Sequence, residues 1–486
     1  MRNAAASLLV VTFLIPAPRA ATGAETGAPL TLSVADAVLE SLANNRALAV
    51  QRFTPEIVGT GEEAAQAQFD TQLGGSATAL WDRSPTTDFD TFESGDGQLL
   101  SLGASRFLPW GTTLGAGVDA RRTSPPEASQ TRFGLSVTQA LLQGLGSDVN
   151  LASVRQARLD TAISAQELRG VTEALVAQVE QACWNYLLAG RGIEIVERSL
   201  RLAEDQLAEV RERIAVGRLA EIEQAAAEAE VARRRENLIN ARSLLATARL
   251  NLLRLVNPPG PGALTREVVV TDLPALPPAD PDPVEAHVAL AERLRPELVQ
   301  ARLELERGDL EVVKTRNGLL PKLDLFIRLG KTGYASSFLD SVDPGGSGYD
   351  VSAGLTLSFP WENSSARAAD RRAALTREQA AESIANLSQL VEVDVRGAWI
   401  EVARLREQVA ATEATRRLQE ETLRAETEKF RVGKSTAFLV AQAQRDLLQA
   451  AIEAETAVAG CLKSLVELYR LEGSLLDRRG ISVADR

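Results

Sequence analysis

The chain contains the stretch Ile214-Ala215-Val216-Gly217-Arg218-Leu219 and, 216 residues later (433 − 217), the stretch Phe430-Arg431-Val432-Gly433-Lys434-Ser435. Both interrupt long segments that lack proline and are rich in helix-forming residues, so each predicts the turn of a helical hairpin. Trp184 lies 33 residues before the first turn glycine, and Trp399 lies 34 residues before the second. A match of this extent indicates a duplication, and it predicts one elongated body built from two related halves.

The composition of the 486 residues favours narrow helical packing. Aromatic residues make up only 4%, and there is one methionine and one histidine, so Ala and Leu must supply much of the core. This composition is typical of coiled coils. The net charge is −12, and no segment combines basic with aromatic residues, which argues against nucleic acid as a partner.

Residues 1–24 have the layout of a signal peptide, with Arg2, an apolar run over residues 4–15, and then prolines and small residues. We therefore expect the mature protein to leave the cytoplasm. No cysteine lies near the expected cleavage site, so we expect no lipid anchor there. Downstream, no apolar run reaches the roughly 18 to 20 residues that a membrane-spanning helix needs, and any membrane insertion is expected to use strands.

Alternation of apolar and polar residues replaces the helical period in residues 72–139, where we expect four strands, and again in residues 323–333 and 349–359. The polar positions hold Gly, Ser, Thr, Asp and Arg. The period alone fits a half-solvated soluble sheet as well as a membrane barrel. Long loops on one side and helices directly after the strands on the other favour a transmembrane β-barrel with a wet lumen.

One chain offers at most six such strands, fewer than the eight of the smallest barrels, and open strand edges do not occur in lipid. The barrel is therefore expected to be shared between chains. Three chains that give four strands each would make twelve. The extra segment in the first half fits an added hairpin at residues 98–121, which preserves strand direction, and six strands from each of three chains is the alternative.

The remaining segments carry the helical period. Residues 148–216 can be helical throughout, a rod of about 100 Å at 1.5 Å per residue, with Ser147 or Asp148 as its cap, and Ser33 can cap the first helix. The first repeat (25–256) is predicted to hold a helix at 30–68, the strands at 72–139, and a hairpin at 148–256 with its tip at 214–220. After a proline-rich crossover (257–283), the second repeat (284–473) is predicted to hold a helix at 284–316, the two further strands, and a hairpin at 363–471 with its tip at 430–437, before a tail (474–486).

Within the crossover, Val268-Val269-Val270 can pair at a sheet edge. Apolar residues at alternating spacings of three and four predict a continuous seam along each hairpin, and Arg234 is the single interruption on the returning helix of the first. Cys461 falls in the seam of the second hairpin, so Cys183 and Cys461 are interpreted as small apolar residues and not as a disulfide. The first seam consists of Leu200, Ala203, Leu207, Val210 and Ile214.

No residue pattern points to catalysis. Gly433-Lys434-Ser435-Thr436 imitates the end of a phosphate-binding loop, but Glu428 stands where that loop needs another glycine. His287 is the only histidine, no cysteine or carboxylate pattern around it suggests a metal site or a triad, and we interpret it as an exposed helix residue. The expectation is a protein that is not an enzyme and that needs no cofactor or metal.

Several motifs accompany the two turns. They are Leu32-Ser33-Val34-Ala35-Asp36-Ala37, Leu42-Ala43-Asn44-Asn45, Phe69-Asp70, Gln139-Ala140-Leu141-Leu142-Gln143-Gly144-Leu145-Gly146, Leu319-Leu320-Pro321-Lys322-Leu323, Glu223-Gln224-Ala225 and Ala441-Gln442-Ala443-Gln444. Together they make the chain resemble the TolC-like outer membrane efflux protein family. The resemblance implies a fold that is mainly α with membrane β: duplicated long hairpins form a coiled-coil α-barrel in the periplasm, and trimerisation completes a β-barrel in the outer membrane.

By this resemblance the protein is a homotrimeric, passive duct that exports small molecules or proteins delivered by an inner-membrane transporter. The hairpin tips would meet a periplasmic membrane fusion (adaptor) protein, and no cofactor is implied. Drug efflux, metal efflux and protein secretion are not distinguished. The alternative is a periplasmic coiled-coil scaffold or adaptor with no channel, which would share the leader and the hairpins but would have no need of six amphipathic strands.

The tips hold the candidate docking residues, where the glycines provide the turn geometry and Val216, Leu219 and Val432 provide exposed apolar surface. The full candidate set is Val216, Gly217, Arg218, Leu219, Val432, Gly433, Lys434 and Ser435.

The periplasmic entrance is expected to differ from that of many relatives. Family members that resemble this chain often carry acidic residues six and nine positions after the second turn glycine, and Leu439 and Gln442 occupy those positions here. Glu223, six positions after the first turn glycine, keeps a carboxylate near the entrance. Its candidate partners are Arg218, Arg431 and Lys434, and we hypothesise a looser, differently charged constriction.

Overall fold

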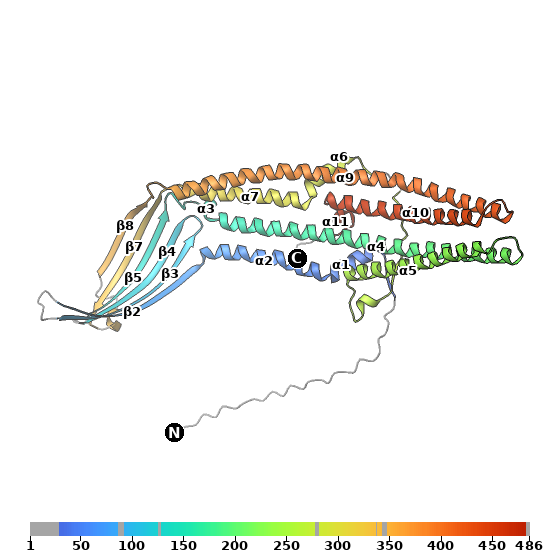
Figure 1. Ribbon diagram of the computed structural model, residues 1–486. Coiled ribbons are helices and arrows are strands. Elements are labelled where there is room, and N and C mark those ends of the chain that lie inside the picture. Colours follow the sequence, from blue (N-terminus) through green and yellow to red (C-terminus); the bar gives the residue numbers. More distant parts are fainter. Residues whose placement is uncertain are drawn as a thin grey trace, which may run out of the picture.

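In this computed structural model the protein is elongated, with a sheet at one end and long helices that extend from it (Figure 1). The structure describes residues 29–85, 92–124, 128–277, 281–336, 338–342 and 348–482. The predicted signal peptide, residues 1–24, lies outside these ranges, as do the last residues of the predicted tail.

Six strands form one antiparallel sheet in the order β2-β3-β4-β5-β7-β8, so all six strands expected from the alternation are confirmed. The two repeats meet in this sheet where β5 pairs with β7. Neither β2 nor β8 has a second neighbour among the described strands, so the sheet is open at both edges. The strands are β2 (Thr71–Pro85), β3 (Phe92–Leu108), β4 (Thr112–Ser124), β5 (Ala128–Ala140), β7 (Lys322–Ala335) and β8 (Gly348–Ser358).

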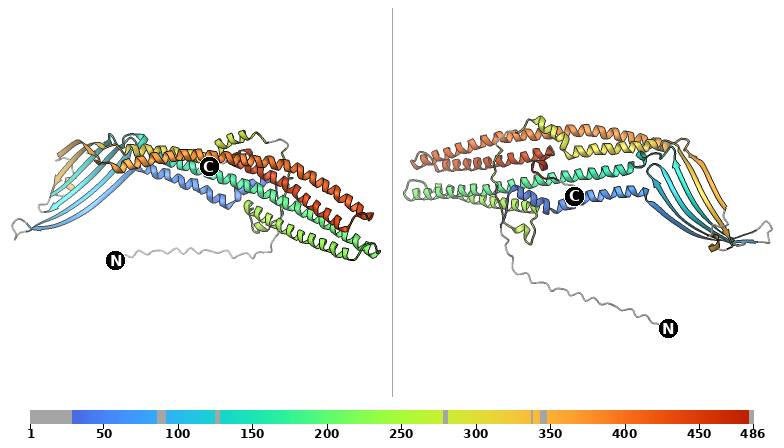
Figure 2. Two further views of the ribbon diagram at one scale, coloured as in Figure 1. Left: turned by 45° about the horizontal axis from the view of Figure 1, so that its top comes forward. Right: turned by 180° about the vertical axis from the view of Figure 1, so that it is seen from behind.

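Two helical hairpins run side by side away from the sheet, and the views in Figure 2 agree on this arrangement. The first consists of α4 (Ala152–Ala215) and α5 (Ile222–Val256), and the second of α9 (Ser364–Arg431) and α10 (Ala437–Leu471). Contacts of α4 with both α5 and α10 place the four helices in the order α5-α4-α10-α9. Nearer the sheet, α2 (Arg46–Gln66) lies beside α4, and α7 (Pro296–Asn317) lies between α4 and α9.

The duplication is visible in this arrangement, because α2, α4 and α5 of the first repeat correspond to α7, α9 and α10 of the second. The long helices α4 and α9 run most of the length of the helical part, whereas their partners are split between its two halves (Figure 1). Within the described residues, no helix combines the length and the apolarity needed to cross a membrane. The short helices are α3 (Ser147–Asn150), η1 (Ala67–Phe69), η2 (Ala263–Thr265), α8 (Phe338–Ser341) and α11 (Leu475–Arg478).

The predicted helix at 30–68 is wrong at its start and is broken in its middle. Leu30–Leu32 forms β1, which pairs in parallel with β6 (Val268–Val270), so the edge pairing expected of the crossover is confirmed. The helix α1 (Val34–Asn44) begins after Ser33, whose hydroxyl accepts from the Asp36 amide as predicted for a cap. The Ser33 hydroxyl in turn lowers the pKa of Asp36. Asn45 has extended backbone and separates α1 from α2.

Two other helix boundaries differ from expectation. Arg295 has extended backbone and divides the predicted helix at 284–316 into α6 (Val284–Leu294) and α7. The helix expected over 148–216 is interrupted at Leu151. Neither Ser147 nor Asp148 caps it, because both lie inside the short helix α3, and the residue before α3 is Gly146 with a φ of 98°. Left-handed backbone favours glycine, so the chain turns sharply there before the long helix begins.

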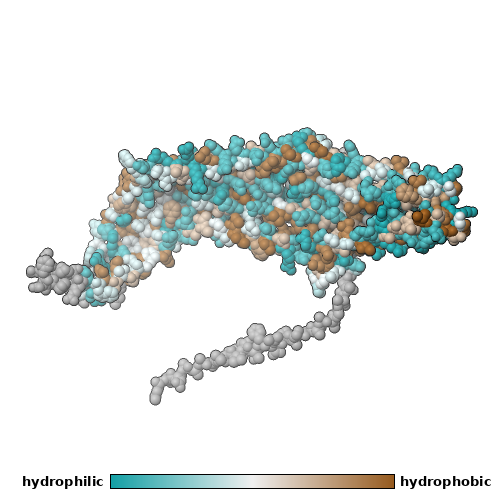
Figure 3. Space-filling model, viewed as in Figure 1, coloured by the Kyte–Doolittle hydropathy of each residue, from teal (hydrophilic) through white to brown (hydrophobic). Residues whose placement is uncertain are grey.

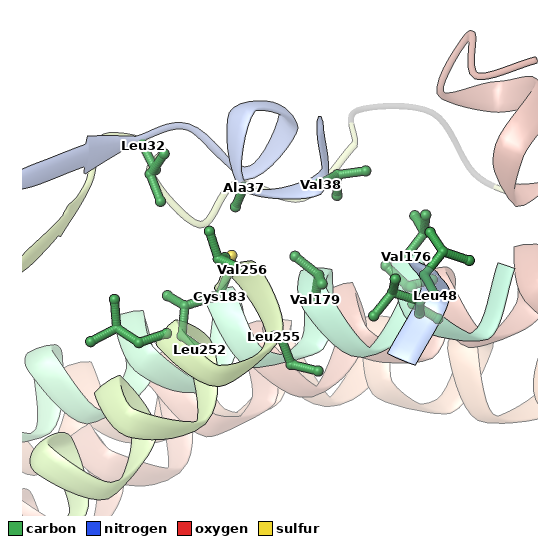
Figure 4. Close-up of a cluster of buried hydrophobic side chains, with 14 of the residues drawn as sticks. Leu32, Ala37, Val38, Leu48, Val176, Val179, Cys183, Leu252, Leu255 and Val256 are labelled. Carbon is green, nitrogen blue, oxygen red and sulfur yellow. The ribbon is translucent and has the colours of Figure 1, made fainter. Parts of the chain in front are cut away.

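The largest core lies halfway along the molecule, where the parallel pair β1–β6 and the helices α1, α4 and α5 meet (Figure 4). Val176, Val179 and Cys183 on α4 pack there against Leu252 and Val256 on α5, and each of the valines and leucines contributes roughly 1.5 to 3 kcal/mol by leaving water. Both cysteines are free and buried, as the seam interpretation predicted.

The interpretation of His287 as an exposed residue is wrong, since only 2% of its surface is accessible. Its Nδ1 contacts a carboxylate oxygen of Glu472, at the end of α10, and Glu472 also accepts from Ser474 and from Arg478 Nε at 2.9 Å. Burial opposes ionisation of Glu472, but these hydrogen bonds hold its pKa below the usual value. The helix α6 is therefore fastened to the C-terminal end of α10 by a polar cluster.

Candidate functional site

The two hairpin turns have nearly the same backbone at the end of the molecule opposite the sheet (Figure 1). Gly217 has a φ of 73° and Gly433 a φ of 75°. In each turn the amide of the residue after glycine donates to the carbonyl five residues back: Arg218 to Arg213 at 2.8 Å and Lys434 to Lys429 at 2.8 Å. This is a Schellman motif, which needs a left-handed residue after the helix, so the turn geometry predicted for both glycines is confirmed.

Large apolar side chains are exposed on both sides of each turn. Val216 and Val432, predicted as exposed, are 65% and 69% accessible. The same prediction for Leu219 is wrong, because this side chain is half-buried against the second hairpin. Sequence reasoning missed Ile222 and Phe438, which are 78% and 64% accessible. Both lie five residues after a turn glycine, so a residue-by-residue comparison of the repeats would have found them. Figure 3 shows hydrophobic surface at this end of the hairpins.

The polar neighbours of the two turns are arranged differently. Ser435 donates to Glu426 at 2.7 Å, and Lys429 contacts the same carboxylate at 2.5 Å. These partners, Lys429 first, lower the pKa of Glu426. Thr436 caps α10 by accepting from the Leu439 amide at 3.3 Å, while the residue before α5 makes no such bond. Side-chain hydrogen bonds thus hold the second tip more firmly than the first.

The candidate entrance residues do not form the ion pairs considered for them. Glu223 is half-buried, and none of its candidate partners contacts it among the described residues. Arg431 pairs instead with Glu428 at 2.7 Å, on its own helix. Leu439 and Gln442 are exposed at the start of α10. Within one chain, the carboxylate of Glu223 therefore stays available for a second copy or for a cation.

Just behind the tips, one arginine joins the two hairpins. Arg213 on α4 donates to the Phe430 carbonyl at 2.8 Å, and its guanidinium lies 4.2 Å from the centre of the Phe430 ring. Glu209 holds the same arginine at 2.6 Å. The buried ring of Phe430 packs with Val210 and with apolar residues of α9 and α10. No pattern in the sequence indicates this contact, because the two residues come from different repeats.

A second polar link lies farther from the tips. Glu230 on α5 pairs with Arg234 at 2.6 Å on the same helix and with Arg445 of α10 at 3.1 Å. Arg234, which interrupts the predicted seam, is buried within the hairpins. Burial lowers the pKa of Arg234, and Glu230 opposes that shift. A buried pair of this kind adds little stability over apolar packing, but removing one member leaves a charge without its partner.

The site therefore offers two apolar, protruding turns and a charged rim, and it does not resemble a catalytic pocket. Over the residues described, no cluster of His, Cys, Asp and Glu with the numbers needed for a metal ion occurs. Exposed apolar side chains on rigid turns are suited to contact with another protein.

A family model described as outer membrane efflux protein matches residues 37–257 and 288–474 of this chain. The two matched segments contain the two helical hairpins and most of the strands. No match was found among curated proteins.

Solved structures of bacterial outer membrane proteins share the fold. The Campylobacter jejuni CmeC outer membrane channel matches with a TM-score of 0.69 at 15% identity, over 98% of this chain and 95% of that one. The outer membrane protein VceC of Vibrio cholerae matches with a TM-score of 0.67 at 15% identity, over 90% and 96%. The open state of the Neisseria gonorrhoeae MtrE outer membrane channel matches with a TM-score of 0.64 at 18% identity, over 91% and 89%.

Proposed function

Because this chain belongs to the outer membrane efflux protein family, we propose that it is one subunit of a passive channel that carries small molecules or proteins across the outer membrane. The cargo would come from an inner-membrane transporter, through a periplasmic adaptor that meets the hairpin tips. The observation that carries the proposal is a band of exposed apolar side chains on one face of the six-stranded sheet.

The apolar band crosses the strands obliquely, as it does in a membrane barrel. One row of paired residues joins Leu73, Ala104, Ala116, Leu135, Leu329 and Val351 across all six strands. From this row the apolar positions of β2 continue away from the helices to Trp81, whereas those of β8 continue toward the helices to Leu357. The band thus shifts by about 20 Å over a sheet about 24 Å wide, a slope of about 40°. Strands of outer-membrane barrels are tilted by about this angle.

Aromatic residues border the band on both sides. Trp81 and Tyr349 are exposed at the end of the sheet far from the helices, and Trp110, Phe359 and Trp361 at the near end. Between Tyr349 and Phe359 the strand covers about 33 Å, which a tilt of about 40° reduces to a height of about 25 Å. Such girdles mark the two interfaces of an outer membrane, and the height fits its apolar layer.

The open edges favour assembly with further copies. The strand β2 runs away from the helices and β8 runs back toward them, so β8 of one copy can pair antiparallel with β2 of the next and continue the sheet. An unpaired edge has no hydrogen-bonding partner in lipid, which makes closure a requirement. We take three copies, the assembly that the family resemblance implies.

The helices offer matching edges for the same assembly. Among the described helices, α9 forms one side of the layer, and α2 with α5 forms the other. Both sides expose large apolar side chains, as surfaces that contact another protein do. They are Val50, Phe53 and Ile57 on α2, Ile239 and Leu250 on α5, and Leu390, Val393 and Ile400 on α9.

Two measurements test the proposal against a soluble periplasmic scaffold. Heat-modifiable trimers in outer membrane fractions, and ion conductance after reconstitution into planar bilayers, are the expected results. A chain recovered wholly in the soluble periplasmic fraction, without conductance, would support the scaffold instead. Co-purification of an inner-membrane transporter through the tips would identify the class of cargo.

A further inference from the structure

The strands β3 and β4 form a hairpin inserted between β2 and β5, and it is part of the barrel wall. The strand β3 is paired along nearly its whole length with β2 on one side and with β4 on the other, and β4 is paired with β5. The hairpin is therefore neither folded into the lumen nor set aside from the sheet. It adds two strands to the circumference that each chain contributes.

The sheet would remain self-consistent without this hairpin. Since β2 runs away from the helices and β5 runs back, the two could pair directly as antiparallel neighbours. Along the rows of paired residues, Leu73 would then face Leu135, and Gly74 would face Gly134. An insertion of two strands, unlike an insertion of one, leaves the direction of β5 and the faces of its side chains unchanged relative to β2. The inserted hairpin therefore changes the width of the sheet and leaves the pairing pattern of the other strands intact.

The polar face of the inserted hairpin carries few bulky side chains between the aromatic borders. A row of paired glycines crosses the sheet from Gly74 through Gly103, Gly117 and Gly134 to Gly330. Of the neighbouring positions on this face of β3 and β4, Ser101, Ser105 and Gly115 are also small, whereas Leu99, Asp119 and Arg121, farther from the helices, are larger. The hairpin therefore adds circumference without filling the space that it encloses.

We propose that the β3–β4 hairpin sets the width of the pore at its outer end: with six strands from each of three chains, the barrel has eighteen strands and leaves room there for bulky, water-soluble cargo. The inference rests on the proposed channel function. At a strand spacing of about 4.8 Å and a tilt of about 40°, eighteen strands enclose a barrel about 36 Å across between opposite backbones, against about 24 Å for twelve. Barrels of sixteen to eighteen strands leave an aqueous channel.

The test compares the trimer with a variant that lacks residues 92–124 and keeps residues 86–91 and 125–127 as the loop between β2 and β5. Polyethylene glycols of graded size are added to the external side of a planar bilayer, and the largest polymer that lowers the conductance gives the width of that opening. We expect the cut-off radius of the wild type to exceed that of the deletion variant by about 1.7-fold. Equal cut-offs would contradict the inference.

Two further readouts complete the experiment. If the deletion variant does not assemble, the wild-type cut-off decides alone, because eighteen strands predict an opening radius of about 12 Å and twelve predict about 7 Å. Gly103→Trp, which has space for its Cβ, should lower the cut-off, whereas Leu102→Trp on the opposite face of the same strand should not. A wild type without any conductance contradicts the channel itself, so the two failures are distinguishable.

Discussion

The two hairpin tips share a backbone turn and differ in what holds it. At the second tip, Thr436 caps the next helix, Ser435 is bound to Glu426, and the ring of Phe430 is buried. At the first tip, Ile214 takes the place of the phenylalanine, and Glu221 caps nothing. Both copies have kept the turn glycine, because the left-handed backbone of the turn needs it. Rigidity and charge, which depend on side chains, have diverged between the copies.

The largest expected effect is the loss of export in Gly433→Trp with trimers intact. Left-handed backbone costs a residue with a side chain about 1 to 2 kcal/mol, too little to unfold the protein, so the loss would come from bulk at the proposed docking surface. Export assays and trimer bands on unboiled gels measure the two properties. Gly433→Ala, which keeps the strain and omits the bulk, is the control. A fully active Gly433→Trp would show that the second tip does not dock.

A smaller effect is expected where the copies differ in their apolar contact. Phe430→Ala should lower the free energy of unfolding by about 3 to 5 kcal/mol, since it leaves a cavity and removes the ring beneath Arg213. Ile214→Ala, at the equivalent position of the first hairpin, should lower it by about 1 to 2 kcal/mol, because that side chain is only half-buried. Denaturant unfolding of the two variants gives the comparison, and equal losses would show that the tips are equally well packed.

The repeats also differ in a buried acid. Burial raises the pKa of Glu173 on α4 to about 7, and Arg169 only partly offsets this. At the corresponding position of α9, by the tryptophan spacing, stands Ser388. Because the pKa of Glu173 is raised in the folded state, its contribution to stability is present in full below about pH 4.5 and is lost as the pH rises through 7.

Glu173→Gln should therefore stabilise the protein by about 1 to 3 kcal/mol at pH 8 and change little at pH 5. Thermal unfolding at the two pH values measures the difference. The same gain at both would show that the effect of Glu173 is packing and not charge. Ser388→Ala, the matched change in the second repeat, should show no such dependence on pH.

The smallest expected effect concerns the charge at the entrance. If Glu223 lines the constriction, trivalent cations should block the wild type more strongly than Glu223→Ala in single-channel recordings. A change of a few-fold in the blocking concentration is expected, because one carboxylate per chain in water contributes only about 1 kcal/mol at close range. Equal block of both proteins would remove Glu223 from the entrance. Glu221→Ala, at an exposed neighbouring position, is the control.

The sequence predicted what depends on local pattern. The turns at Gly217 and Gly433 and the six strands follow from period and turn chemistry, which neighbouring residues determine. The errors arose where a distant segment decides the outcome. Leu30–Leu32 is a strand because Val268–Val270 lies beside it, and His287 is buried because the end of α10 covers it. The contact of Arg213 with Phe430 joins residues 217 positions apart, so no window of sequence contains it.

The central core has a consequence for the order in which the protein can fold. Val176 belongs to the first repeat, yet the same cluster contains Leu475 and Leu476, about 300 positions later. Bringing these leucines to Val176 closes a loop of about 300 residues, and contacts of such sequence separation form slowly. The first hairpin can collapse early, but its base stays unfinished until α11 arrives. A chain stalled during export would therefore present an open apolar core, and its exposed surface would mark it for capture or degradation.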